Sequence, residues 1–328
     1  MRMKAVTFNP ADDKFTIRSV SVSIPEEKEL LIKVEATGLN PVDSKIIFWK
    51  KMVDGMASDW IPGLDVSGYV AAVGNKTTIF KVGDRVLYHG NMFKPFGGFA
   101  EYAIQNEATV IKHPDLDSVT AAATPCAGWT AWRALADKLR ITSKDTILIA
   151  GGAGGVGNFA IQIAKHFKLK KIITTCSTPK TDFVKNLGAT DTIDYNSADV
   201  VAEVLRVTNG EGVTKGLDAV GRDNDILIAN ALAYEGEMVE LVDLVRPEAY
   251  KNSFTQGLTF HQLSLGSGHR NGLKGEKTLK RAGEKFSALV EKKLIAVPVT
   301  KVISFSEVPE ALTEMLNKKT LGKIVLKI

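Results

Sequence analysis

The middle of the chain alternates short apolar runs with segments whose apolar residues recur at helical spacing. The apolar runs predict strands, and the spaced segments predict amphipathic helices. The predicted strands lie at 146–150, 171–176, 191–194, 215–220, 237–242 and, as a sixth, 258–265. The predicted helices lie at about 155–168, 180–187, 198–208 and 224–233. This alternation predicts an α/β fold with a doubly wound parallel sheet and right-handed crossovers.

The first third of the chain has a different pattern, with short strands punctuated by glycine. Residues 30–36 alternate apolar and charged positions, as a half-buried strand does, and residues 66–73 are another strand candidate. Residues 82–86 and 98–102 continue the same style. These signals predict a small β-rich domain.

Beyond Gly268 the regular alternation ends. The pattern there predicts a charged helix near 276–292, a strand near 298–304, a helix near 306–317 and a final strand at 323–328. Such a tail is too short for a core of its own. We therefore expect it to join the N-terminal region in one discontinuous β-rich domain, residues 1–124 and 268–328, with a nucleotide-binding domain at 125–267 between them.

Composition narrows the class of protein without naming its chemistry. The 328 residues exceed the usual size of one domain, and 45% hydrophobic with 24% charged residues suits a globular protein. The 42 Lys and Arg residues outnumber the 37 Asp and Glu residues, but this excess is scattered. Its densest stretch, 274–293, lacks the interleaved aromatic residues of a nucleic-acid surface. We therefore expect no nucleic-acid partner.

Cysteines and apolar runs bear on the compartment. Cys126 and Cys176 are the only cysteines, and two such residues make neither a disulfide framework nor a paired C-x-x-C metal site. No apolar run approaches the roughly 20 residues of a membrane span, and the N-terminus shows no signal-peptide core. We expect a soluble, cytoplasmic protein with no membrane partner.

A glycine-rich turn follows the first strand of the alternating region. Gly152, Gly154 and Gly157 satisfy G-x-G-x-x-G, a spacing that allows a tight turn, close approach of a pyrophosphate and close helix packing. The backbone N–H groups around Gly155 and Val156, where the helix begins, suit the bound anion. A glycine triad alone can be a flexible surface loop, but the strand before it and the amphipathic helix after it favour a dinucleotide site.

The end of the second predicted strand bears on which nicotinamide cofactor is bound. NAD-binding folds place an acidic residue about 20 positions beyond the glycines, where it binds ribose hydroxyls. Here the strand ends in Thr175-Cys176-Ser177-Thr178-Pro179-Lys180, and no carboxylate comes before Asp182. Hydroxyls and the cation of Lys180 suit a 2′-phosphate, so we expect NADPH rather than NADH. The alternative is that Ser177 caps the next helix and Lys180 is merely solvated.

Several short strings along the chain resemble one known family in their order and spacing. They are Asn40-Pro41-Val42-Asp43, Pro62-Gly63-Leu64-Asp65-Val66-Ser67-Gly68, Gly97-Gly98-Phe99-Ala100-Glu101-Tyr102, Ala127-Gly128-Trp129-Thr130-Ala131-Trp132, Leu187-Gly188-Ala189, Asp194-Tyr195 and Gly322-Lys323-Ile324-Val325-Leu326. With the glycine turn, they make essentially the whole chain similar to the zinc-free quinone oxidoreductase branch of the medium-chain dehydrogenase/reductase superfamily. The resemblance implies a GroES-like β domain for substrate, a Rossmann domain for NADPH, and an active site between them.

The resemblance also implies which residues meet the cofactor. In the family, residues matching Lys180 and Tyr195 hold the 2′-phosphate. The residue matching Thr130 lies beside the nicotinamide, and segments matching the turns at Val220 and Leu241 border the bound cofactor. We expect these residues, with Ser177 and the glycine turn, to form the cofactor site.

Substrate, metal and partner follow from the same resemblance. The residue matching Asn40 faces the substrate pocket. Zinc-dependent members of the wider superfamily carry Cys, His and often Cys at the positions of Asn40, Leu64 and Cys126, and only Cys126 remains here. One thiolate cannot replace the three protein ligands that a catalytic zinc usually needs, so we expect no metal. Family members usually pair through the sheet edge near 258–265, so we expect a homodimer.

Without a metal, carbonyl polarisation must come from hydrogen bonds. We therefore expect NADPH-dependent, metal-free hydride transfer to a quinone or an α,β-unsaturated carbonyl, in which conjugation spreads the developing charge. Asn40 and Tyr88 are the candidate catalytic residues. Asn40 is the candidate donor to the developing oxyanion, and the candidate proton sources are solvent and a nearby hydroxyl such as that of Tyr88. Asn40 before Pro41 equally suits a turn, and Asp43 is expected to cap a helix near 44–51.

The pocket wall has further candidates, and two other functions stay open. His89, in the loop that follows Tyr88, is a candidate for the rim. Five aromatic side chains suit either a flat acceptor or the core, namely Phe48, Trp49, Trp60, Phe93 and Phe96. The alternative functions are a carbonyl or alcohol dehydrogenase of the same superfamily, which the missing ligands disfavour, and an NADPH-binding sensor with little turnover.

Overall fold

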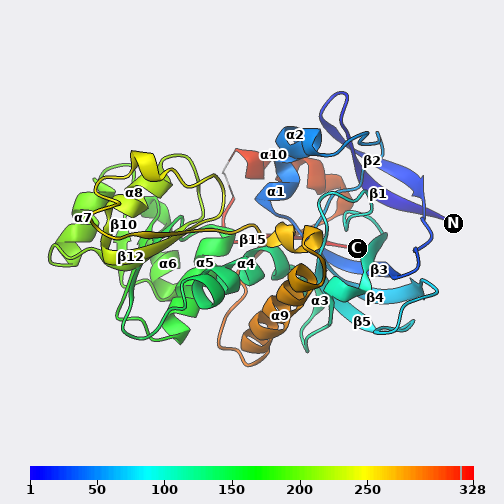
Figure 1. Cartoon of the computed structure of the whole chain (residues 1–328). Helices are drawn as coiled ribbons and strands as arrows, with labels where there is room; N and C mark the ends of the chain where they lie inside the picture. The colour runs from blue at the N-terminus through cyan, green and yellow to red at the C-terminus, as the bar shows by residue number, and fades with distance from the viewer. Residues whose placement is uncertain (318–319) are drawn as a thin grey trace. The chain divides into compact units, whose positions relative to one another are not determined.

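The computed structural model describes residues 1–317 and 320–328, which form two compact units (Figure 1). The β unit comprises residues 1–129, 265–293 and 297–328. The α/β unit comprises residues 130–264 and 294–296. The domain bounds expected from the sequence, 1–124 with 268–328 and 125–267, stay a prediction. None of the helices in the described residues is both long and apolar enough to cross a membrane.

The α/β unit is built on a parallel sheet with the strand order β10-β9-β8-β11-β12-β13. Its strands are β8 (Thr146–Ala150), β9 (Lys171–Thr175), β10 (Asp191–Ile193), β11 (Val213–Asp218), β12 (Leu232–Glu240) and β13 (Thr259–Gln262). β8 and β9 are almost wholly buried, as strands are when helices cover both faces of a sheet. The predicted doubly wound parallel sheet is confirmed. The strand order reverses at β8, and sheets of this kind bind ligands at the carboxyl ends of the strands beside such a point.

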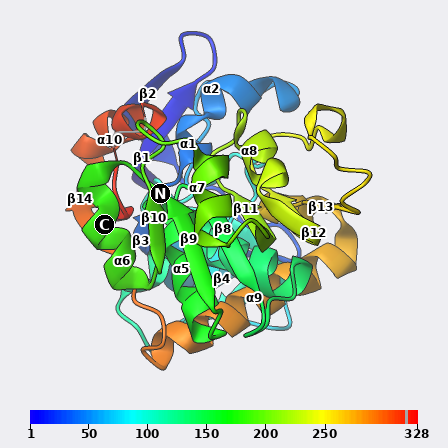
Figure 2. The same cartoon turned by 90° about the vertical axis from the view of Figure 1, so that its left-hand side faces the viewer.

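Helices cover both faces of this sheet (Figures 1 and 2). They are α4 (Thr130–Trp132), α5 (Gly155–His166), α6 (Thr181–Leu187), α7 (Val200–Val207) and α8 (Asn224–Asn230). α5 and α6 pack together on one face, and α7 and α8 pack together on the other. Phe159, Ala160 and Ile163 on α5 are fully buried, which anchors this helix and the turn before it on the sheet.

Two strands of the α/β unit begin earlier than the sequence pattern predicts. β11 begins at Val213 and β12 at Leu232, rather than at 215 and 237. Their pairing register shifts between Val213 and Lys215, and Glu235 has a φ of 56°. The irregular backbone interrupts the strand pattern, so the sequence marks only the regular part of each strand.

The β unit contains a mixed sheet with the order β14-β15-β3-β4-β5-β7, and β6 also pairs with β3. Its strands are β3 (Glu29–Gly38), β4 (Asp65–Val73), β5 (Arg85–His89), β6 (Tyr102–Asn106), β7 (Val110–Lys112), β14 (Val299–Ile303) and β15 (Lys323–Lys327). A separate hairpin is formed by β1 (Arg2–Asn9) and β2 (Lys14–Ser21). β15 pairs antiparallel with β3, so the C-terminal tail shares a sheet with the first third of the chain.

The helices of the β unit are short except for one. They are α1 (Pro41–Ser44), α2 (Ile46–Trp49), α3 (Ser118–Ala122), α9 (Gly272–Glu291) and α10 (Val308–Leu316). α9, orange in Figure 1, buries one face through Leu279, Ala282 and Phe286. A π-helical turn, Pro125–Trp129, follows α3 and ends the first stretch of this unit.

Three expectations for this unit need correction. The strand expected at 98–102 is found at Tyr102–Asn106, and Ala100 forms only an isolated bridge to Ala5. α9 begins at Gly272 rather than near 276. The helix expected near 44–51 is broken into α1, α2 and a 3-10 turn.

The start of α1 also differs from expectation. Asn40, not Asp43, is the N-cap residue, and Asp43 is the third residue of the helix. The Asn40 backbone N–H donates to Asp43 Oδ2 at 2.8 Å. The Asp43 side chain thus holds the start of α1 from inside its first turn.

Candidate active site

The glycine turn joins β8 to α5 at the carboxyl edge of the parallel sheet. Gly151 rather than Gly152 turns the chain out of the strand, with a φ of 78° that favours glycine. A Cβ on Gly152 would collide with the Thr174 side chain, and one on Gly157 with the Gly151 carbonyl. A Cβ on Gly154 would meet only the Gly151 carbonyl oxygen, at 3.3 Å. Gly154 therefore presents backbone that a phosphate can approach.

The first turn of α5 is open to an anion. Gly154 is its N-cap residue and offers no capping side chain, so the N–H groups of Gly155 and Val156 have no side-chain acceptor there. Asn158 Nδ2 donates to the carbonyls of Gly154 and Gly155, each at 2.8 Å. This amide holds the carbonyls of the turn on the helix side, which leaves its N–H groups as the ligand-facing donors.

Ser177, Lys180 and Tyr195 lie just beyond the carboxyl ends of the neighbouring strands β9 and β10. Ser177 stands at the N-cap of the 3-10 turn Thr178–Lys180, but its side chain makes no capping hydrogen bond. Tyr195 is 56% exposed, and Lys180 forms no ion pair with any residue that the structure describes. The hydroxyl and the cation of this segment are thus available to a ligand.

Asp194 is a carboxylate at this place that the sequence interpretation missed. Its Oδ2 accepts hydrogen bonds from the backbone N–H of Thr178 at 2.7 Å and from the Thr178 hydroxyl. The bond from the Thr178 side chain, with those from the Asn196 and Thr178 backbone, lowers the pKa of Asp194 to about 2. Asp194 follows the neighbouring strand, so its approach to Thr178 depends on sheet order rather than on local sequence. It ties the segment of Ser177 to that of Tyr195.

Val220, Leu241 and Thr130 complete the expected cofactor site. The Val220 backbone N–H donates to Asp218 Oδ1 at 2.8 Å, and the Leu241 N–H donates to the Asp218 carbonyl at 3.2 Å. A Cβ on Gly151 would come within 2.6 Å of Val220 Cγ2, so the turn after β11 packs against the glycine turn. Thr130 is buried in α4, the helix that contacts α5.

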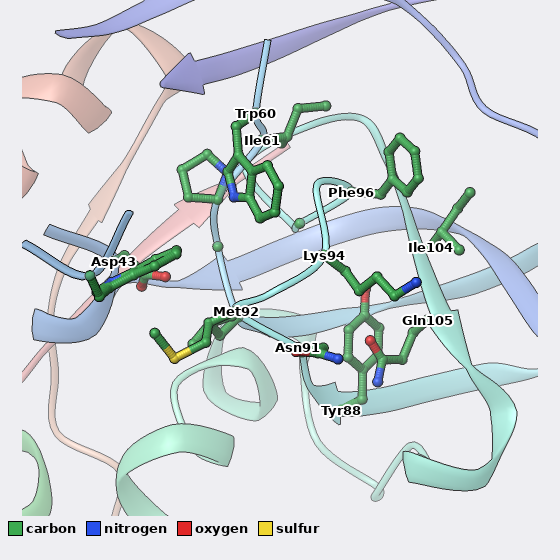
Figure 3. A pocket seen from close by; sticks show the side chains of 16 residues that line it. Asp43, Trp60, Ile61, Tyr88, Asn91, Met92, Lys94, Phe96, Ile104 and Gln105 are labelled. Atoms are coloured by element: carbon green, nitrogen blue, oxygen red, sulfur yellow. The ribbon is translucent and has the colours of Figure 1, made fainter. Parts of the chain in front are cut away.

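A pocket opens in the β unit beside β5 and β6 (Figure 3). Its walls include Trp60, Tyr88, Met92, Lys94, Phe96 and Gln105. Tyr88 is 2% exposed, and its hydroxyl has no hydrogen-bond partner among the described residues. Burial raises the pKa of Tyr88, so the hydroxyl stays protonated. It is a buried donor that a ligand can satisfy.

The other pocket candidates divide into two groups. Trp49, Trp60 and Phe96 line the pocket, whereas Phe48 and Phe93 are not among its lining residues. Phe48 is 67% exposed, and the Phe93 ring faces the guanidinium of Arg270 at 4.7 Å.

His89 does not lie at the rim of this pocket. It is the buried last residue of β5, and its ring stacks on that of His269 with 5.8 Å between the centroids. The His89 carbonyl accepts a hydrogen bond from His269 Nε2 at 3.0 Å. Burial, with the neighbouring His269, lowers the pKa of His89 well below its usual value.

Asn40 lies in a buried polar cluster and is not among the residues that line the pocket. Its Nδ2 donates to Asp65 Oδ2 at 2.8 Å and to the Gly38 carbonyl at 3.3 Å. Its Oδ1 accepts from Lys323 Nζ at 2.5 Å. Both hydrogens of the amide are therefore used within the protein.

The titratable groups of this cluster are the two acidic side chains of Asp43 and Asp65 and the ammonium group of Lys323. Lys323, on β15, is 2% exposed, and its Nζ lies 3.6 Å from Asp65 Oδ2. Burial raises the pKa of Asp65 to about 6, against the opposing effects of Lys323 and Asn40. Burial, together with the neighbouring Asp65, raises the pKa of Asp43 to about 8. Lys323 is thus the internal counter-ion of Asp65.

One group in the described part of the chain brings metal-binding atoms together, namely Asp65, His89 and Cys126, within 4.8 Å of one another. However, Asp65 Oδ1 already accepts the Cys126 backbone N–H at 2.8 Å, and the ammonium of Lys323 stands beside the other oxygen. A divalent cation on Asp65 would be repelled by that ammonium. These residues do not fit a catalytic zinc.

The parallel sheet with its glycine turn and the separate β unit with its pocket define a class of two-domain dinucleotide-binding proteins. The chain matches the model of the alcohol dehydrogenase GroES-like domain over residues 26–115 and that of the zinc-binding dehydrogenases over residues 155–272. It is 31% identical over 307 residues to a quinone oxidoreductase of Pseudomonas aeruginosa, with 92% of both chains covered. The chain belongs to the quinone oxidoreductase branch of the medium-chain dehydrogenase/reductase superfamily.

Two further comparisons bear on fold and on substrate. A 2-methylene-furan-3-one reductase of Solanum lycopersicum is 40% identical over 186 residues, which are 53% of this chain and 47% of the relative. The match thus spans about half the length of that relative. The crystal structure of a quinone oxidoreductase of Pseudomonas syringae pv. tomato has a TM-score of 0.87 and 26% identity, with 99% of this chain and 100% of that chain covered. The expected GroES-like and Rossmann folds are confirmed.

Proposed function

We propose that this protein reduces a quinone or an α,β-unsaturated carbonyl by hydride transfer from NADPH, without a metal. The observation that carries the proposal is the glycine turn, with its open backbone at Gly154 and its uncapped helix start. The substrate class comes from the names of the relatives, quinone oxidoreductase and 2-methylene-furan-3-one reductase. The poor fit of the Asp65 cluster to zinc supports an acceptor that conjugation already activates.

The choice of NADPH rests on the segment beyond β9. Ser177 has a hydroxyl that caps no helix, and Lys180 has a cation that pairs with no described carboxylate. Tyr195 is exposed beside them and offers a further hydroxyl. A 2′-phosphate would accept hydrogen bonds from these donors, whereas the ribose hydroxyl of NADH would need a hydrogen-bond acceptor. Asp194, the acceptor at this place, already receives the donors of Thr178.

In the β unit, Tyr88 is the stronger of the two candidate catalytic residues. Its hydroxyl is buried, protonated and unpartnered, so it can donate to the oxygen of an acceptor in the pocket and stabilise the charge that develops there. Its raised pKa makes it a hydrogen-bond donor rather than a ready acid, so the proton that completes the reduction comes from solvent. Asn40 could donate to a substrate only after releasing Asp65 or Gly38. The bound nicotinamide supplies the hydride.

The two alternative functions make different demands on these residues. A carbonyl or alcohol dehydrogenase of the superfamily would need an electrophile for an unconjugated carbonyl, and the Asp65 cluster does not fit a zinc ion. A sensor would bind NADPH with the same glycine turn but would not turn over. Only measured turnover separates the sensor from the reductase.

One assay tests the proposal. NADPH absorbance is followed with purified protein against ortho- and para-quinones, enones, enals and simple aldehydes, each with and without a chelator. We expect oxidation of NADPH with conjugated acceptors only, at rates that the chelator leaves unchanged. Loss of activity on chelation would refute the metal-free mechanism, and cofactor binding without turnover on any acceptor would favour the sensor.

Two expectations extend the proposal beyond the site. β13 is an edge strand of the parallel sheet, with Thr259–Gln262 as its residues, and we propose that it pairs two copies into a homodimer. Sedimentation of the purified protein tests this. The cytoplasmic location expected from the sequence stays a prediction.

A further inference from the structure

A pair of buried carboxyl groups lies where β11 and β12 end. Asp218 and Glu240 are direct partners in the parallel register of these strands, and both are 0% exposed. Asp218 Oδ1 accepts the backbone N–H groups of Val220 at 2.8 Å and Gly221 at 2.9 Å. Asp218 therefore closes the turn that packs against the glycine turn.

Glu240 closes the next turn in the same way. Its Oε1 accepts the backbone N–H groups of Val242 at 2.6 Å and Asp243 at 2.8 Å. The other oxygens, Asp218 Oδ2 and Glu240 Oε2, are buried without a donor among the described residues, and the two side chains are close enough for a hydrogen bond between them to contribute to the raised pKa of Glu240. Two ionised oxygens would repel strongly at this distance, whereas one proton between them makes a strong O–H···O⁻ hydrogen bond.

Most of the titratable groups around the pair are engaged with other residues. The titratable side chains on the neighbouring turns and strands are those of Arg222, Asp225, Glu237, Asp243, Arg246, Tyr250 and His261. Arg246 pairs with Asp225 at 2.5 Å, Tyr250 donates to the same carboxylate, and His261 pairs with Glu237 at 3.3 Å. β8, on the other side of β11, has no charged residue. In the described part of the chain, no lysine or arginine forms an ion pair with either carboxyl of the pair.

We propose that Asp218 and Glu240 form a proton-sharing positioning pair that holds the two turns bordering the cofactor and makes cofactor binding depend on one proton. The inference rests on the proposed function, because it takes the turns of Val220 and Leu241 to border a nicotinamide cofactor. Burial, with the neighbouring Asp218, raises the pKa of Glu240 to about 8, so the shared proton is present at neutral pH. Once it is lost, the two carboxylates repel, and both turns are displaced together.

Glu240→Gln is the decisive variant. The glutamine oxygen can still accept from Val242 and Asp243, and its amide can donate to Asp218, so the variant imitates the protonated pair at every pH. The matched control is Glu237→Gln, the same change on the same strand in a residue paired with Lys215 and His261. The dissociation constant of NADPH is measured by fluorescence from about pH 6 to about pH 10 for the three proteins.

As the pH rises through about 8, wild-type NADPH binding should weaken relative to that of Glu240→Gln. We expect the ratio of the wild-type dissociation constant to that of the variant to rise about fivefold or more. Titration of the cofactor phosphate cancels in this ratio. The Glu237→Gln control should follow the wild type. Superimposable profiles for wild type and Glu240→Gln would overturn the inference and leave the proposed function intact.

A second measurement does not depend on the cofactor. Infrared difference spectra of an Asp43→Asn protein between about pH 7 and about pH 9 should show the loss of one protonated-carboxyl C=O band that the added change Glu240→Gln removes; Asp43→Asn is needed because the pKa of Asp43 is also about 8. Absence of that band would overturn the shared proton even if the variant failed to fold. If the band is present but no NADPH binds at any pH, the proposed function fails and the positioning role fails with it.

Discussion

The two units treat their charged groups in opposite ways. The β unit buries the ammonium group of Lys323 beside Asp65, and the neutral hydroxyl of Tyr88 in its pocket wall has no hydrogen-bond partner among the described residues. The α/β unit leaves its cation, Lys180, unpaired among the described residues and buries Asp218 and Glu240 with no cation beside them. An unpaired cation suits an anionic ligand, and an unpaired hydroxyl suits an uncharged oxygen. The difference supports a phosphate-bearing cofactor for one unit and a neutral acceptor for the other.

Lys323→Met tests the buried ammonium and has the largest expected effect. The change removes the partner of Asp65 and one hydrogen bond to Asn40, leaving an uncompensated buried carboxylate. We expect the free energy of unfolding to fall by about 3–5 kcal/mol. Urea unfolding measures it, with Lys327→Met, an exposed residue of the same strand, as the control. Equal stability of the two variants would show that Lys323 does not neutralise the cluster.

Lys180→Ala tests the unpaired cation of the α/β unit. Loss of a charge-assisted bond to the 2′-phosphate should weaken NADPH binding by about 1.5–3 kcal/mol, while NADH binding stays unchanged. Titration calorimetry with both cofactors measures the difference. The exposed Lys185→Ala serves as the control. Equal weakening of both cofactors would contradict the phosphate role of Lys180.

The pH dependence of stability compares the acids of the two units directly. The pKa values of Asp43 and Glu240, both about 8, lie above those of the unfolded chain, so the folded state holds these protons more tightly. Their stabilising contribution is complete below about pH 4 and is lost as the pH rises to about 8. We expect the free energy of unfolding to fall by roughly 2 kcal/mol per group between about pH 6 and about pH 8.

Asp43→Asn and Glu240→Gln should each remove one part of the fall in the free energy of unfolding between about pH 6 and about pH 8. The two parts should add, because the residues lie in different units and share no partner. Urea unfolding of both single variants and the double variant at each pH provides the measurement. If neither variant flattens the curve, both acids titrate normally.

Tyr88→Phe tests the unpaired hydroxyl and has the smallest expected effect. Loss of a neutral hydrogen bond to the acceptor should lower kcat/KM by about 1 kcal/mol, or roughly fivefold. The free energy of unfolding should stay equal or rise, because the change removes a buried donor without a protein partner. The exposed Tyr69→Phe is the control. A stability loss with unchanged kcat/KM would assign Tyr88 to the core instead.

The local sequence pattern was sufficient to predict features that depend only on residues close together in the chain. The strands β8 and β9 and the helix after the glycine turn appear at their predicted places, because apolar periodicity and glycine spacing act over a few residues. The strand pattern failed at β12, where a positive φ at Glu235 interrupts it. It also failed near 98–102, where only Tyr102 belongs to a strand and Ala100 forms an isolated bridge.

The site shows the same limit. The glycine turn and the segment of Ser177 and Lys180 were identified from the sequence, although Gly151 rather than Gly152 makes the turn. Nothing local pairs Asp194 with Thr178, because sheet order brings β10 beside β9. The role expected for Asn40 stays a prediction, and the hydrogen bonding of its amide depends on Lys323, near the other end of the chain.

By itself, the amino-acid sequence determined the α/β sheet, the glycine turn and the family. The sheet and the turn depend on residues close together in the chain, and the family on short strings in the same order as in its members. The tertiary structure alone decided how charges are compensated. Lys323 meets Asp65 only because β15 joins β3 in one sheet, and Asp218 meets Glu240 only because β11 and β12 are in register. Electrostatic and hydrogen-bond energies depend on distance in space and on burial, and neither can be read from separation along a chain.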